Sequence, residues 1–163
     1  MWSSEVTNMI IAGIGETLYM TLVSTIAGYI IGLPMGIVLT VSDKDGIRPN
    51  SFIYKILDVI VNIVRSIPFI ILLVLLIPFT RFLVGKSYGS TATIVPLVVA
   101  AAPYIARMVE SSLKEVDAGV IEAARSMGAS DFDIVTKVLL VEARTSLLVG
   151  ATISLGTILG YSA

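Results

Sequence analysis

The chain has 163 residues, of which 56% are hydrophobic and only 14% charged, and its formal net charge is -1. A soluble domain carries about 25% charged residues, so this composition favours an integral membrane protein, while the balanced charge argues against a nucleic-acid surface or a polybasic anchor. The lack of Cys and His excludes disulfides, thiol chemistry, His-based catalysis and zinc or haem sites.

Residues 1–16 contain Glu5 and Glu16 but no Lys or Arg. A cleavable signal peptide has a positively charged start followed by an apolar stretch of about 7–15 residues. We therefore interpret residues 1–16 as a retained N-terminal tail that leads into the first membrane span.

A helix that crosses a bilayer needs about 20 mostly apolar residues. Four segments approach this length: 17–41, about 56–79, about 91–108, and a fourth that begins near Ser146 and still continues at Tyr161. The second must include Asp58 or Arg65, because its uninterrupted apolar part is too short to cross alone. We expect residues 17–163 to form an all-α integral membrane domain.

Cationic residues orient these spans, because Lys and Arg favour cytoplasmic loops. Only Arg81 and Lys86 lie between the second and third spans, and residues 1–16 have no cation. The remaining cations mostly lie between the first two spans or at and beyond the end of the third: Lys44, Arg48, Lys55, Arg107, Lys114, Arg125, Lys137 and Arg144. The pattern predicts an external N-terminus and a cytoplasmic segment at about 109–145.

Small residues recur every four positions in two of the spans, where they permit close approach of helix backbones. The first stripe is Ser24, Gly28, Gly32 and Gly36, and the second is Thr152, Gly156 and Gly160. We interpret both as helix-packing faces, either within one chain, at a subunit interface or along a pore. Five prolines are candidate sites of helix kinks: Pro34, Pro68, Pro78, Pro96 and Pro103.

Arg65 is the most unusual residue within a span. A central Arg costs about 2.5–3.5 kcal/mol on insertion scales, so it should face protein or water. Asp58 lies two turns away, too far for a direct pair within one helix. Arg65 either reaches toward the cytoplasmic interface or a neighbouring span, or lines a pore; Asn62, one turn earlier, shares its polar stripe.

The cytoplasmic segment predicts two short helices that meet at Gly128, which is suited to a helix C-terminal cap. Ser130 is positioned as the N-cap of the second helix, with Asp133 in its first turn, and Asp133 and Lys137 are spaced to pair. Apolar residues fall on one side of the first helix: Val116, Val120, Ala123, Ala124 and Met127. Such a knob fits a groove on a partner, although an amphipathic loop lying on the membrane has the same pattern.

Within this segment, Glu122, Ala123, Ala124 and Gly128 are followed, after nine intervening residues, by Val138, one further residue and Leu140. This pattern resembles the EAA loop of bacterial ABC importer permeases. The strings Arg65-Ser66-Ile67-Pro68-Phe69, 101–110 and 160–163 resemble the methionine type of that family. The likeness covers about residues 17–163. The chain departs from the pattern at Val141, where the family usually has Pro, and Val138 replaces a commoner Ile.

The resemblance implies a type I importer transmembrane domain in a bacterial inner membrane, with four of about five expected spans and hence an incomplete C-terminal part. It implies a homodimeric pore, two copies of a separate ABC ATPase docked on the loop at Glu122, Ala123, Ala124, Gly128, Val138 and Leu140, and an external substrate-binding lipoprotein. Asn62, Arg65, Ser66 and Pro68 are the candidate residues of the translocation path. The expected cargo is D- or L-methionine.

We find no G-x-x-x-x-G-K phosphate loop, no nucleophile–base pair and no metal-ligand cluster in the sequence. The chain is therefore expected to be a pore subunit without enzymatic activity or cofactor. Three alternatives remain open: the same machine for another small solute, a self-powered secondary transporter or channel, and a membrane scaffold whose loop binds something other than an ATPase. Secondary transporters usually show intramembrane carboxylates and inverted repeats, and here only Asp58 qualifies.

Overall fold

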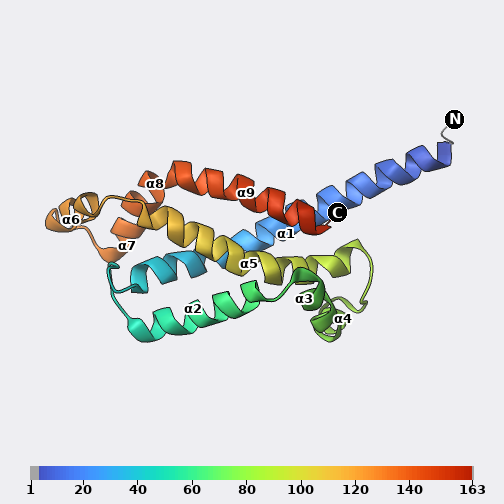
Figure 1. Ribbon diagram of the computed structural model, residues 1–163. Helices are drawn as coiled ribbons and strands as arrows, with labels where there is room; N and C mark the ends of the chain where they lie inside the picture. The colour runs from blue at the N-terminus through green and yellow to red at the C-terminus, as the bar shows by residue number, and fades with distance from the viewer. Residues whose placement is uncertain (1–3, 163) are drawn as a thin grey trace.

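The computed structural model describes residues 4–162, and helices are the regular secondary structure of that part of the chain. In chain order the helices are α1 (Ser4–Ser42), α2 (Ser51–Ser66), α3 (Phe69–Leu75), α4 (Ile77–Val84), α5 (Ser90–Lys114), α6 (Ala118–Ser126), α7 (Asp131–Asp133), the π-helix η1 (Ile134–Leu139), α8 (Leu140–Glu142) and α9 (Arg144–Ser162). Figure 1 shows an elongated bundle of α1, α2, α5 and α9, with α6 and α7 at one end and α3 and α4 toward the other.

Helix α1 joins the predicted tail and the first predicted span into one element of 39 residues. At a rise of about 1.5 Å per residue it is about 58 Å long, against about 30 Å for the hydrocarbon core of a bilayer. Its N-terminal half projects beyond the rest of the bundle in Figure 1, and residues 4–16 are exposed. The segment 1–16 is therefore helical from Ser4 onward, and residues 1–3 lie outside the described part.

Three helices of the described chain are long and apolar enough to cross a membrane: α1, α5 and α9. The expected second span is not one helix, because α2 and α3 meet at an angle of 102°. The chain breaks at Pro68, which lacks an amide donor, and Ile67 before it is extended, with φ -85° and ψ 122°, as a residue preceding proline favours. The segment predicted as the second span is thus a bent pair of helices, long and apolar enough together to cross a membrane, and the kink predicted at Pro68 is confirmed.

The other prolines have smaller effects on the helices that contain them. Pro34 lies inside α1, and Pro96 and Pro103 lie inside α5, without ending either helix. Pro78 occupies the first turn of α4, where its missing amide hydrogen costs no intrahelical bond.

The core follows one face of α5. Its members on that helix recur every four residues, as expected for a helical face: Leu97, Ala101, Ile105, Val109 and Leu113. Leu139, Ala143 and Ile158 close the same cluster from η1, from the residue after α8 and from α9. Helix α5 is thus the central element of the bundle.

The first small-residue stripe lies against α5 at very short range. A Cβ atom built on Gly32 would lie 2.6 Å from the carbonyl oxygen of Ala102, and one on Gly36 would lie 2.6 Å from that of Ala106. Ser24 and Gly28 are also buried. Only glycine allows the two backbones to approach this closely.

The second stripe behaves differently. A Cβ atom on Gly156 or Gly160 would meet no described atom within 4 Å, and Thr152 is exposed. Helix α9 instead buries Gly150, Ser154 and Ile158. Within this chain, the packing face of α9 is therefore the one that carries Gly150, Ser154 and Ile158, and not the predicted face with Gly156 and Gly160. Helix α9 is rotated so that Ile158 enters the core.

We predict that Gly36→Ala lowers stability by about 1–3 kcal/mol, because the added methyl overpacks the α1–α5 contact. Gly13→Ala is the matched control in the same helix, since a Cβ there meets nothing within 4 Å. Thermal unfolding of both variants in lipid nanodiscs checks this. Equal melting temperatures for the two variants would contradict the close approach.

Candidate functional site

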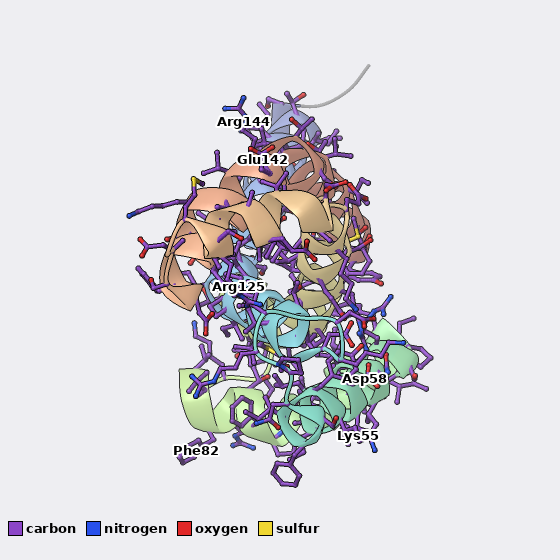
Figure 2. All side chains as sticks on the ribbon, turned by 90° about the vertical axis from the view of Figure 1, so that its left-hand side faces the viewer. Lys55, Asp58, Phe82, Arg125, Glu142 and Arg144 are labelled. Atoms are coloured by element: carbon purple, nitrogen blue, oxygen red, sulfur yellow. The ribbon has the colours of Figure 1, made fainter. Side chains whose placement is uncertain are left out.

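Residues 117–142 form a compact knob at one end of the bundle, which Figure 2 views end-on with Arg125, Glu142 and Arg144 labelled. Asp117 begins it as an N-cap, its Oδ1 accepting a hydrogen bond of 2.7 Å from the amide of Gly119. Helix α6 then runs to Ser126, and Gly128 adopts a φ of +84°. The predicted helix end at Gly128 is confirmed, because this backbone conformation favours glycine.

The second half of the knob begins as predicted. The Ser130 side chain accepts a hydrogen bond of 3.2 Å from the amide of Asp133, which confirms its role as an N-cap. Lys137 Nζ lies 2.5 Å from Asp133 Oδ1. The hydrogen bonds from Lys137 and Ser130 lower the pKa of Asp133.

Residues Ile134–Leu139 form a π-helix rather than the expected α-helix. A π-turn joins residues five apart, so Ile134 and Leu139 both face inward, with exposures of 0% and 1%. Val138 and Leu140, which the family pattern singles out, flank Leu139 and are half-buried. The helical path continues through Val141 to Glu142 and is interrupted at Ala143 before α9 begins.

The inner side of α6 differs from the predicted one. Ala124 is buried and Ile121 packs against the core, whereas Ala123 is exposed, as are Val120 at 41% and Met127 at 82%. The apolar pattern alone does not say which of two overlapping helix faces the core takes. Met127, Phe132 and Val141 are exposed together with Val120.

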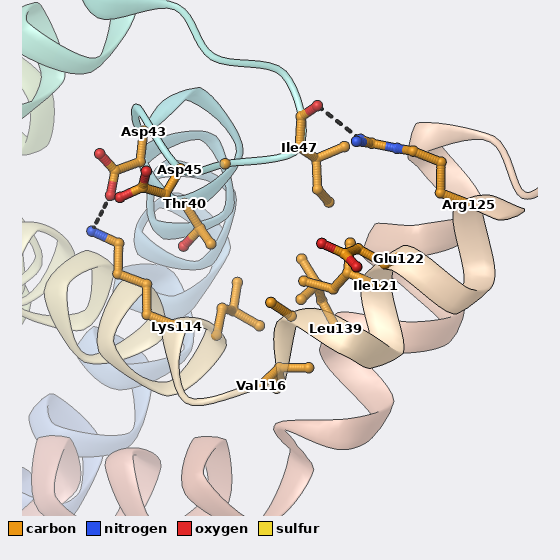
Figure 3. A pocket seen from close by; sticks show the side chains of 13 residues that line it. Thr40, Asp43, Asp45, Ile47, Lys114, Val116, Ile121, Glu122, Arg125 and Leu139 are labelled. Carbon is orange, nitrogen blue, oxygen red and sulfur yellow. Dashed lines mark hydrogen bonds and ion pairs between the residues drawn. The ribbon is translucent and has the colours of Figure 1, made fainter.

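Glu122 faces a cavity of about 430 Å³ between α6, the end of α5 and the segment 43–50 (Figure 3). Across this space Arg125 Nη2 donates a hydrogen bond of 2.9 Å to the carbonyl oxygen of Ile47. On the opposite wall Lys114 Nζ lies 2.6 Å from Asp43. The hydrogen bond from Lys114 lowers the pKa of Asp43.

A network of charged side chains that the sequence analysis did not anticipate lies next to this cavity. Its centre is Glu110, 4% exposed. Arg107 Nη1 donates to Glu110 at 2.6 Å, and Lys114 Nζ at 2.8 Å. Arg107 also pairs with Asp58 of α2. The sequence does hold a signal for part of this network, because Arg107, Glu110 and Lys114 are spaced three and four residues apart on one helix face. Asp58 pairs with Arg107 on another helix and not with Arg65.

Arg65 lies at the other end of α2, beside the break at Pro68. Its side chain is exposed, and it has no hydrogen bond or ion pair within residues 4–162. It lines a cavity of about 240 Å³ with Phe69, Tyr104 and Tyr161, among other residues. The rings of Phe69 and Tyr161 stack with centroids 4.9 Å apart.

Asn62 does not share the environment of Arg65. Its Oδ1 accepts a hydrogen bond of 3.1 Å from Arg107, so it belongs to the charged network. Ser66 donates to the carbonyl oxygen of Asn62 at 2.7 Å, and Pro68 is the residue that precedes α3. The predicted polar stripe of α2 is thus divided: Asn62 belongs to the charged network, and the side chain of Arg65 has no partner among the described residues.

Comparison with protein families gives one broad match. A family model described as a binding-protein-dependent transport system inner membrane component matches residues 28–163. The match includes α2, the broken region, α5 and the whole knob.

Similar proteins extend the likeness to almost the whole chain. The D-methionine transport system permease protein MetI of Salmonella typhimurium is 55% identical over 155 residues, which are 95% of this chain and 71% of that protein. The probable D-methionine permease MetI of Vibrio cholerae is 41% identical over 162 residues, 99% of this chain and 72% of that protein.

Solved structures share the fold. A chain of the methionine ABC transporter MetNI in an inward-facing conformation matches with a TM-score of 0.97 and 53% identity, over 99% of this chain and 74% of that chain. An amino acid ABC transporter crystallised with histidines matches with a TM-score of 0.76 at 24% identity, over 97% of this chain and 71% of that chain. The second likeness is one of fold.

We predict that Ser130→Ala destabilises the start of α7 by about 0.5–2 kcal/mol, because the N-cap hydrogen bond is lost. Hydrogen–deuterium exchange of the amides in 131–135 should therefore accelerate. Ser126→Ala, at the exposed end of α6, is the control and should leave these amides unchanged. Identical exchange in both variants would contradict the cap.

Proposed function

Because the chain belongs to the family of binding-protein-dependent transport system inner membrane components, we propose that it is the membrane-spanning permease subunit of an ATP-driven importer for D- or L-methionine. The likeness to D-methionine permeases over 95% of the chain carries this proposal. It covers both the knob and the broken α2–α3 region, so it is not a match to one motif.

The knob supplies the place at which an ATPase acts. We infer that two ATPase subunits dock on the 117–142 knobs of a permease homodimer. Glu122, Ala123 and Ala124 lie on the first helix of each knob, and Gly128 follows its end. Residues Val138 and Leu140 belong to the second half of the same surface. ATP binding favours the state in which the knobs approach each other, and an equilibrium shifts only by such a difference in affinity. Hydrolysis then returns the pore to its inward-facing state.

The orientation follows from charge. The knob and the segment 43–50 lie at one end of the bundle (Figure 1), and they carry Lys44, Arg48, Arg125 and Lys137. Cations favour the cytoplasmic side, so this end faces the cytoplasm and the N-terminus lies outside. An external binding lipoprotein delivers the substrate to the outer end of the pore, and the assembly resides in the bacterial inner membrane.

The translocation path is proposed to pass the break in α2–α3. Arg65 is charged, unpaired within the described chain and placed about one helix length from the cytoplasmic start of α2. A charge at this depth is tolerated where it faces water or a polar cargo. Ser66 and Pro68 form the backbone break beside it, and Asn62 lies one turn before. Irregular backbone within a membrane protein is itself tolerated where it lines a cavity.

The test of the whole proposal is gentle purification with intact masses of all co-purifying chains, followed by uptake of labelled methionine in proteoliposomes. The proposal expects an ATPase with a phosphate loop, a lipid-anchored binding protein and uptake that requires ATP. Uptake driven by an ion gradient without ATP would overturn it in favour of a secondary transporter. Recovery of the chain without an ATPase, across several detergents, would favour a scaffold.

Gly128→Val is predicted to abolish most ATP-driven uptake, because a β-branched residue resists the φ of +84° that the knob requires. Gly85→Val is the matched control: Gly85 has a φ of +82° but ends α4, away from the knob. Both variants carry similar backbone strain. Equal losses of uptake would contradict a specific role of the knob.

Arg65→Gln is predicted to reduce uptake strongly while the ATPase still co-purifies, since the change removes a charge at the break and leaves the knob intact. Arg81→Gln, an exposed cation of α4, is the control. Uptake rates measured at several methionine concentrations check this. An Arg65→Gln transporter with wild-type uptake would exclude Arg65 from the path.

A further inference from the structure

Helix α2 is held in the bundle by few apolar contacts. Val61 is its one buried residue, whereas α5 buries residues along most of its length. Because lipid gives apolar helix faces no hydrophobic reason to associate, helices in a membrane are held by close packing and by polar contacts. With one buried residue, the packing attachment of α2 is weak compared with that of α5. Other interactions must therefore fix the position of the helix that leads into the break at Pro68.

The charged network supplies those interactions at three points on α2. Arg107 binds Asp58 and Asn62, and the hydroxyl of Tyr54 donates to Glu110 Oε1 at 3.2 Å. Arg107 and Glu110 both project from α5. Charge-assisted hydrogen bonds of this kind are stronger and more directional than neutral ones, so they define where α2 sits along α5.

The same network reaches the knob by a second route. Lys114 joins Glu110 to Asp43, at the start of the segment 43–50. This segment receives the hydrogen bond from Arg125 of α6 at Ile47. It ends at Asn50, whose Oδ1 accepts from the amides of Phe52 and Ile53 and so caps α2. The knob is consequently hydrogen-bonded to the segment 43–50, and this segment is hydrogen-bonded to the first turn of α2.

We infer that Glu110 and Arg107 are positioning residues that tie α2 to the knob, so that α2 and the cytoplasmic half of α5 move as one body. Movement of α6 then reaches the α2–α3 break through the segment 43–50 and α2. Glu110 is a suitable centre because a buried carboxylate with three partners holds its geometry, whereas a single exposed pair contributes little. The inference rests on the proposed function only in taking an ATPase as the cause of the movement of α6. The contacts that hold α2 to α5 lie within this chain.

Asp58→Asn is the test variant, because it removes one charge at the half-exposed edge of the network and keeps the side-chain shape. Tyr54→Phe is a second, milder variant that removes one hydroxyl. Asp45→Asn is the matched control: its only ion-pair partner among the described residues is Lys44, 3.8 Å away, and both side chains are 83% exposed.

The measurement is hydrogen–deuterium exchange of the purified full complex in nanodiscs, with and without a non-hydrolysable ATP analogue. In the unmodified complex and in Asp45→Asn, the amides of 51–66 should stay equally protected in both conditions. Asp58→Asn should lose that protection, and Tyr54→Phe should lose part of it, while the protection of α5 persists. Unchanged protection of 51–66 in Asp58→Asn, or a nucleotide-dependent loss in the unmodified complex, would overturn the inference.

A second readout separates positioning from mere structure. The number of ATP molecules hydrolysed per methionine imported should rise in Asp58→Asn and stay unchanged in Asp45→Asn. A proportional fall of hydrolysis and import, with their ratio intact, would contradict a coupling role. If the unmodified complex imports no methionine, the proposed function fails on that result, and the exchange experiment still decides whether the tie exists.

Discussion

The close approach of α1 and α5 is the constraint on which the rest of the structure depends. Lipid offers no hydrophobic driving force between helices, so association requires packing at short range. Gly32 and Gly36 provide that contact by placing α1 directly against the carbonyl oxygens of α5. The other faces of α5 then contact two further helices. Helix α9 packs on α5 through the apolar core, and α2 is bound to α5 by the charged network around Arg107 and Glu110.

Apolar packing and polar contacts thus hold different helices on α5. The α1–α5–α9 packing is apolar and continuous, and interiors of this kind deform little. Helix α2 adds to its small apolar contact around Val61 a set of polar attachments, made by Tyr54, Asp58 and Asn62. The polar ties are directional and fix the place of α2 along α5, so the helix that leads to the Pro68 break follows any movement of the end of α5 that carries them.

The sequence by itself determined the helical membrane class, the places of the clearest spans along the chain and the local structure of the knob. These follow from interactions between near neighbours: run lengths of apolar residues, the left-handed cap at Gly128, the N-cap at Ser130 and the pairing of Asp133 with Lys137. The family resemblance also came from the sequence, because Glu122 and Gly128 stand at fixed spacing within one continuous segment.

Only the tertiary structure decided which faces are inside and which charges meet. The rotation of α9 selected Gly150 and Ser154 over Gly156, and that of α6 selected Ile121 and Ala124 over Met127. Periodicity allows neighbouring faces equally, so the choice depends on the helices packed opposite. The pairing of Asp58 with Arg107 joins residues 49 positions apart, and no local pattern encodes such a contact because it exists only once α2 lies against α5.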